Sequence, residues 1–100
     1  MDHFPHPPWA VSPDETSVSD STAFGPCEQA VEAFAAKSEG KIVERRYYVS
    51  KQWGRVLRAK VGFVRANSAV TLLVTCWSGA GPGVQMAVEV DGCGPQQGGC

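Results

Sequence analysis

The fold of this chain is decided by residues 42–77, which read IVERRYYVSKQWGRVLRAKVGFVRANSAVTLLVTCW. Apolar and polar side chains alternate through much of this stretch, a period of two that is typical of strands with one buried face. Turn residues interrupt the pattern near Gly54 and near residues 67–68. The stretch therefore predicts three consecutive strands, and a fourth follows it. The predicted strands are residues 42–50, 55–65, 69–77 and 84–90.

A helix is predicted before the strands. Apolar residues recur at helical spacing from Cys27 to Ala35, Pro26 suits the first turn, and Gly40 is a natural end. The connections between the strands are short, which favours an antiparallel meander. We therefore predict an α+β fold of order α-β-β-β-β, with the helix packed on a four-stranded antiparallel sheet.

The chain has 100 residues, which is room for one domain. We place that domain at residues 26–91. Residues 1–25 are rich in proline, serine and acidic side chains, a composition that predicts a disordered arm. Residues 92–100 are dominated by glycine and glutamine, and they predict a flexible tail.

The turns also predict the register of the strands and hence the two faces of the sheet. A three-residue loop over residues 52–54 needs Gly54 in the left-handed conformation, and a two-residue loop is expected at residues 67–68. The predicted partners are Tyr47 with Ala59, Phe63 with Leu72, and Trp77 with Gln85. In this register the even-numbered residues of strand 69–77 point toward the helix and the odd-numbered ones point away from it.

The face that points away from the helix is the candidate binding surface. It combines aromatic rings with cations and carries few carboxylates. Tyr, Trp and Arg are the residue types enriched at the energetic centres of protein interfaces. One row of this face is expected to place Arg58 between Tyr48 and Trp77. The candidate binding residues are Tyr48, Arg58, Trp77, Arg46, Lys60 and Leu73.

Three interpretations of this face stay open. It is a solvated sheet face of a structural or accessory domain, a contact with a protein partner or a second copy of the chain, or a site for a polyanion such as single-stranded nucleic acid. Polyanion binding would use stacking on Tyr48 and Trp77. Eight of the nine basic residues lie between Lys41 and Arg65, although the net charge is only −1. We predict a binding module for protein partners.

The arm allows a second hypothesis besides disorder. A segment with aromatic and acidic residues can dock in extended form, either on its own sheet or on a partner. The acidic residues of the arm would then complement the cations of the candidate binding surface. The acidic candidates for this contact are Asp14, Glu15 and Asp20, and the cations are Arg46, Arg58 and Lys60.

The four cysteines show no metal-binding spacing. The predicted topology brings Cys27, at the start of the helix, near Cys76, at the end of the third strand. Cys93 then has Cys100 as its remaining partner. Whether either pair is bridged depends on the redox compartment. The alternative is that Cys27 and Cys76 are small buried hydrophobic residues.

No catalytic residues, metal ligands or cofactor site are predicted. The two histidines, His3 and His6, lie on the arm, and no serine or cysteine has a histidine near it in the predicted fold. An enzyme is therefore not expected. No apolar run is long enough to span a membrane. The absence of a signal peptide suggests the cytoplasm, whereas paired cysteines would suit a periplasmic or secreted protein whose signal had been removed.

Overall fold

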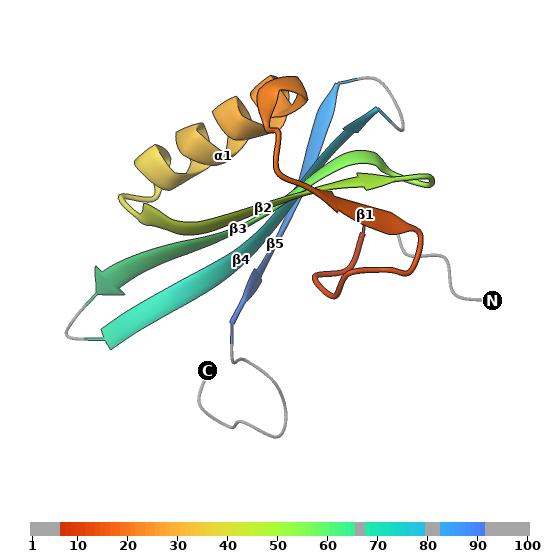
Figure 1. The fold of residues 1–100 in the computed structure, drawn as a ribbon. Coiled ribbons are helices and arrows are strands. Elements are labelled where there is room, and N and C mark those ends of the chain that lie inside the picture. The colour runs from red at the N-terminus through yellow and green to blue at the C-terminus, as the bar shows by residue number, and fades with distance from the viewer. Residues whose placement is uncertain (1–6, 66–67, 80–82, 92–100) are drawn as a thin grey trace.

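The structure is a computed structural model, and it describes residues 7–65, 68–79 and 83–91. These residues form one α-helix, one short 3₁₀-helix and five strands. The elements are β1 (Glu15–Val18), η1 (Thr22–Phe24), α1 (Gly25–Lys37), β2 (Lys41–Ser50), β3 (Gly54–Arg65), β4 (Ser68–Gly79) and β5 (Val84–Val90). The strands form one antiparallel sheet in the order β1-β2-β3-β4-β5, and α1 packs on one face of it (Figure 1). The predicted α+β class is confirmed.

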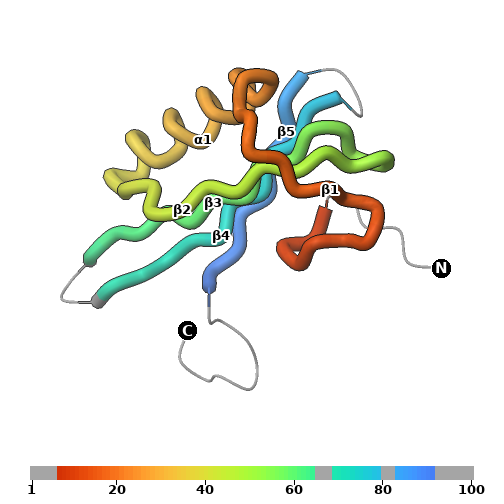
Figure 2. Tube along the Cα trace, in the orientation of Figure 1, coloured from red at the N-terminus to blue at the C-terminus, as the bar shows by residue number. Residues whose placement is uncertain are grey.

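The fifth strand is the difference from the predicted fold. β1 comes from the arm and pairs with the second half of β2, from Glu15 opposite Ser50 to Val18 opposite Tyr47. Figure 2 follows this part of the chain from residue 7 through β1 and up into α1. The composition of the arm concealed the strand because its order comes from the hydrogen-bonding edge of β2 rather than from a run of apolar side chains.

The register of β2, β3 and β4 differs from the predicted register by two residues. Tyr47 lies opposite Leu57, and Phe63 lies opposite Val70. Each connecting loop begins one residue earlier than expected, which moves the partners by two positions except at the start of β2, where a bulge between Ile42 and Glu44 shifts the register again. At this bulge Ile42 packs on the helix side and Val43 is exposed. A shift of two leaves a side chain on its predicted face, so the even-numbered residues of β4 do point toward the helix. The pairing of Trp77 with Gln85 is as predicted.

Gly54 has the left-handed backbone that the sequence required, with φ +81°. It is the first residue of β3 and lies opposite Ser50, so the loop spans residues 51–53. A Cβ atom at this position would stand 2.4 Å from the carbonyl oxygen of Ser78. Both the turn and the close approach of β4 therefore require glycine here.

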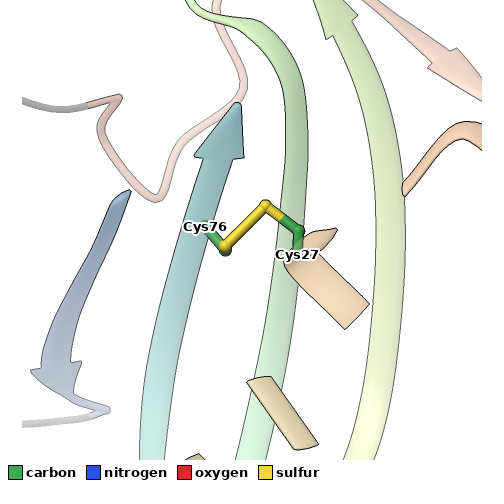
Figure 3. Close-up of a disulfide and its surroundings, with 2 residues drawn as sticks. All are labelled: Cys27 and Cys76. Carbon is green, nitrogen blue, oxygen red and sulfur yellow. A yellow bond between two sulfur atoms is a disulfide. The ribbon is translucent and has the colours of Figure 1, made fainter. Parts of the chain in front are cut away.

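The main core lies between α1 and the sheet. Its centre is a disulfide between Cys27 and Cys76, whose Cα atoms are 5.7 Å apart (Figure 3). The predicted proximity of these two cysteines is confirmed, and they are bridged. Cys93 and Cys100 lie outside the described residues. The buried core residues are Phe24, Cys27, Val31, Ala35, Leu57, Ala59, Val61, Val74 and Cys76.

Candidate protein-binding site

The candidate binding surface lies on the face away from α1, as predicted, but it is not open to solvent. Tyr48 and Trp77 form a second apolar cluster with Val56, and they are only 5% and 4% exposed. The side chain of Arg58 is completely buried. The expectation that these residues face water is wrong. The segment that leads into β1 contacts Arg58 through Pro8 and Ala10, whereas Trp53 packs against Trp77. This face therefore binds a segment of its own chain.

Arg58 is the centre of this contact. Its guanidinium donates hydrogen bonds from Nη1 and Nη2 to the two carboxylate oxygens of Glu15, the second over 2.9 Å. Nη2 also donates to the main-chain carbonyl of Pro8 over 2.8 Å, and Nε donates to the same oxygen over 3.2 Å. A longer contact of 3.4 Å reaches the carbonyl of Ala10. Arg58 thus binds one carboxylate and two backbone carbonyls of an extended segment.

Arg58 and the neighbouring cation, Arg46, each lie against one aromatic ring. The Cζ atom of Arg58 lies 4.9 Å from the centre of the Tyr48 ring, and that of Arg46 lies 5.6 Å from the Trp9 ring. Both distances are within the range of cation–π attraction. Trp9 belongs to the arm, so the arm adds an aromatic contact to its ionic one.

A second carboxylate holds the arm at the β2–β3 turn. Asp14 accepts a hydrogen bond of 3.1 Å from the hydroxyl of Ser50 and one of 3.3 Å from the main-chain amide of Gln52. The same hydroxyl accepts hydrogen bonds from the amides of Gln52 and Trp53. Ser50 is buried. Asp14 and Glu15 are thus the carboxylates of the described part of the arm for which a contact with the sheet is seen.

Asp20, the third of the acidic candidates, contacts none of the predicted cations in the described part of the chain. It accepts hydrogen bonds from the amide and hydroxyl of Thr22, at 2.9 and 2.5 Å, just before α1. These two hydrogen bonds lower the pKa of the Asp20 carboxyl below its ordinary value. The role predicted for Asp20 as a partner of the sheet is therefore wrong, since Thr22 competes locally for its oxygens.

The observed register separates the predicted site residues. Arg58 lies opposite Arg46 and Thr75, whereas Val56 lies between Tyr48 and Trp77. The side chain of Arg58 nevertheless reaches the Tyr48 ring. Arg46, Lys60 and Leu73, the remaining candidates, lie at neighbouring positions of the same face. Leu73 is buried there and is paired with Lys60 on the neighbouring strand.

The cations of this face are paired with carboxylates. Glu44 lies 2.7 Å from Nε of Arg46 and 3.7 Å from Nζ of Lys60, and Glu15 neutralises Arg58. These three cations were the ones that the polyanion interpretation requires. Because each has an acidic partner within the chain, the geometry does not favour a polyanion over a polypeptide.

Tyr47 has a polar contact on the opposite face, at the start of α1. Its hydroxyl donates a hydrogen bond of 2.5 Å to Glu28, which also pairs with Arg45. Burial, followed by this hydrogen bond and the negative charge of Glu28, raises the pKa of Tyr47 to about 12. The group is fixed in its neutral form and ties β2 to the helix.

Neither a metal cluster nor an acid–base pocket stands out in the part of the chain that the structure describes. No group of three or more His, Cys, Asp or Glu residues there could hold a metal ion. An open depression of about 480 Å³ lies where β2 begins, β3 ends and β4 begins. Its titratable lining residues are Glu39 and Lys41. Among the described residues, no helix is long and apolar enough to cross a membrane.

Fold and site together define a small α+β domain with an internal disulfide and a sheet face that holds an extended segment. Comparison with models of protein families, with curated proteins and with solved structures finds no match. The function is therefore argued from the site alone.

Sequence reasoning missed two of the groups that complete the site. The carbonyls of Pro8 and Ala10 are main-chain atoms, so no side-chain pattern indicates them. Glu15 was one of three acidic candidates, and its side chain alone of the three reaches Arg58. The pairing of β1, which begins at Glu15, with β2 is the information that would have selected it.

Proposed function

We propose that this protein is a small non-enzymatic module that binds protein partners, and that its site recognises an extended acidic segment. The observation that carries the proposal is the contact of Arg58 with Glu15, Pro8 and Ala10. One buried guanidinium binds both a carboxylate and main-chain carbonyls. A peptide-binding site needs both kinds of contact, one to a side chain and one to the backbone of its ligand.

The geometry matches a general mode of peptide recognition. An extended peptide adds a strand to a sheet edge, main-chain hydrogen bonds provide affinity, and side-chain contacts provide specificity. Here the added strand is β1 on the edge of β2, and the specific contact is the bidentate pair of Arg58 with Glu15. The arm thus acts as an intramolecular ligand, and a partner would present a similar segment in its place.

The bidentate pair makes this site selective for a carboxylate. A planar guanidinium matches the two oxygens of a carboxylate and holds them at fixed geometry. A neutral amide in the same position would leave the buried guanidinium without a counter-charge, which is strongly unfavourable. We therefore expect a partner segment to place Asp or Glu against Arg58, with apolar or aromatic residues several positions before it.

The test uses the full chain with the substitution Glu15→Gln, which weakens the hold of its own arm. A synthetic peptide of residues 7–18 is titrated into this variant while the ring signals of Tyr48 and the side-chain signal of Arg58 are followed by NMR. The peptide should bind and shift both signals. The matched control is the same peptide with Glu15→Gln, which should bind at least about tenfold more weakly if the charged hydrogen bonds contribute their usual free energy.

Two outcomes would overturn the proposal. One is equal binding of the two peptides, which would remove the carboxylate from recognition. The other is no binding although the arm signals of the variant show that its own segment has left the sheet. A single-stranded oligonucleotide added at two salt concentrations tests the polyanion alternative, because displacement of the arm that weakens steeply with salt would indicate that class of ligand.

A further inference from the structure

The sheet has two edges, and the chain protects them differently. The edge at β1 is four residues long, and its Glu15 points inward to Arg58. Short edge strands and inward-pointing charges are common protections against edge-to-edge pairing. β5 forms the other edge and has seven residues, Val84–Val90. It contains neither proline nor a basic residue, and its pairing with β4 shows no bulge.

β5 also carries an uncovered apolar row on the helix side. Val84, Met86, Val88 and Val90 are each between 37% and 44% exposed. No residue of β5 belongs to the core cluster beneath α1. The exposure is therefore a property of the whole strand, and it coincides with backbone groups that pair with no other strand among the described residues.

The ladder with β4 determines which amides of β5 point outward. The amide of Asp91 donates to the carbonyl of Thr71, the residue directly opposite in the register. Hydrogen-bonded and non-hydrogen-bonded pairs alternate along an antiparallel ladder. The odd-numbered residues therefore bond to β4, and the amides of Val84, Met86, Val88 and Val90 face outward.

We propose that β5 pairs with β5 of a second copy of this chain, antiparallel and centred on Ala87. In this register every residue of the strand finds a partner. Val84 lies opposite Val90 of the other copy, and Met86 lies opposite Val88. These are the residues whose amides point outward, so each pair exchanges two main-chain hydrogen bonds. A two-fold axis through the Ala87 pair makes both halves of the contact equivalent.

The polar side chains of β5 agree with this register. Glu89, the one charged residue of the strand, lies opposite Gln85 of the second copy, whose amide can donate to the carboxylate. The two Glu89 side chains stand at opposite ends of the contact and do not repel each other. On the helix side the two apolar rows lie next to each other, so each valine gains an apolar neighbour. A second copy thus provides hydrogen-bond partners for the outward main-chain groups, a donor for Glu89 and apolar neighbours for the exposed row.

The surface is separate from the arm site, and its test is independent of the proposed function. Sedimentation of the wild-type chain over a range of concentrations should show a species of twice its mass. Amide hydrogen exchange should show protection of Met86 and Val88 that increases with concentration, while Ala87 and Glu89 stay protected throughout. The variant Glu15→Gln should dimerise as the wild type does, whatever its arm does.

Substitutions at Val88 locate the contact. Val88→Pro removes an outward amide without removing a hydrogen bond to β4, and Val88→Lys adds the charge that commonly protects edge strands. Both should sediment as a single chain. Val64→Lys is the matched control, because Val64 lies on β3 and is even more exposed, at 74%, and this variant should dimerise normally.

A wild-type chain that stays at single mass at the highest concentration, with fast exchange at Met86 and Val88, would overturn the inference. Dimerisation that is unchanged in folded Val88→Lys would overturn it as well. If Val88→Pro does not fold, the lysine variant and the exchange pattern of the wild type decide the question.

Discussion

Glu15 and Arg58 lie 43 positions apart in the sequence and form an ion pair in which both side chains are completely buried. A buried charge is tolerated only when it is paired and its remaining hydrogen-bonding groups are satisfied. The carbonyls of Pro8 and Ala10 provide that satisfaction for Arg58. The ion pair therefore depends on the docked arm, and it adds to the contacts that hold the arm through β1 and Asp14.

The first prediction concerns the geometry of the guanidinium. Arg58→Lys keeps the positive charge but removes the planar fork that binds both oxygens of Glu15 and the carbonyl of Pro8. Leaving buried acceptors unsatisfied costs about 1–3 kcal/mol, and we expect urea unfolding to show a loss in this range. The loss of unfolding free energy should be largest if the substitution also releases the arm from the sheet.

Arg46→Lys is the control for that substitution. Arg46 is exposed, and its pair with Glu44 lies at the surface, where ion pairs contribute about 0–1 kcal/mol. Its stability should stay within about 0.5 kcal/mol of the wild type. Equal losses in the two variants would contradict a special role for the buried guanidinium.

The second prediction concerns the disulfide. It closes a loop with a sequence separation of 49, and the chain-entropy estimate for a loop of this length is about 4 kcal/mol. Reduction should lower the free energy of unfolding by up to this amount, measured by urea unfolding with and without a phosphine reductant. The double variant Cys27→Ala/Cys76→Ala serves as the control, since a reductant should leave its stability unchanged. A wild-type chain that is equally stable with and without the reductant would contradict the prediction.

The third prediction concerns pH. The pKa of Tyr47 is about 12 in the folded chain and 10.0 in its ordinary state. The neutral form is therefore favoured by folding, and this contribution to stability is complete below pH 10 and is lost as the pH rises toward 12. Absorbance of the ionised phenol should show a titration step near pH 12 in the wild type, and this step should be missing in Tyr47→Phe. An ordinary titration near pH 10 for this residue would contradict the hydrogen bond to Glu28.

The fourth prediction concerns the β2–β3 turn. Gly54→Ala places a Cβ atom on a backbone of positive φ and against the carbonyl of Ser78. Such strain costs about 1–3 kcal/mol, and thermal unfolding should show a clear loss. Gly62→Ala is the control, because a Cβ atom at Gly62 meets its nearest atoms only at 3.8 and 4.0 Å, an ordinary contact distance, and this glycine has no positive φ. Similar melting temperatures for both variants would contradict the strain.

The sequence predicted those features that depend on the period of its side chains. The alternation through β3 and β4 places Leu57, Val74 and Cys76 on one face whether or not the register shifts by two, so the core and the proximity of Cys27 to Cys76 followed. The exact pairing of residues across the strands could not be predicted. A three-residue loop can span residues 52–54, with Gly54 as its last residue, or residues 51–53, with Gly54 as the first residue after it. The side-chain pattern thus indicates which face of the sheet a residue lies on more firmly than it indicates which residue lies opposite.

The site was only half predictable for a related reason. Tyr48, Arg58 and Trp77 were identified from residue type and phase, but the burial of Arg58 involves contacts with a segment whose composition predicts disorder. That segment is ordered by contacts with distant residues: Asp14 with Ser50, and Glu15 with Arg58. Long-range contacts of this kind leave no local periodicity, so a carboxylate in a polar stretch gives no sign of its partner.

The disulfide has a consequence for any competitor of the arm. Cys27 lies at the beginning of α1, so the covalent link to Cys76 anchors the point from which the chain departs toward β1. A detached arm would remain tethered close to its site, at an effective concentration on the order of millimolar. A partner in solution must exceed that local concentration or bind correspondingly more tightly. Cleavage of the chain between β1 and α1 would abolish this advantage and turn the site into an open receptor.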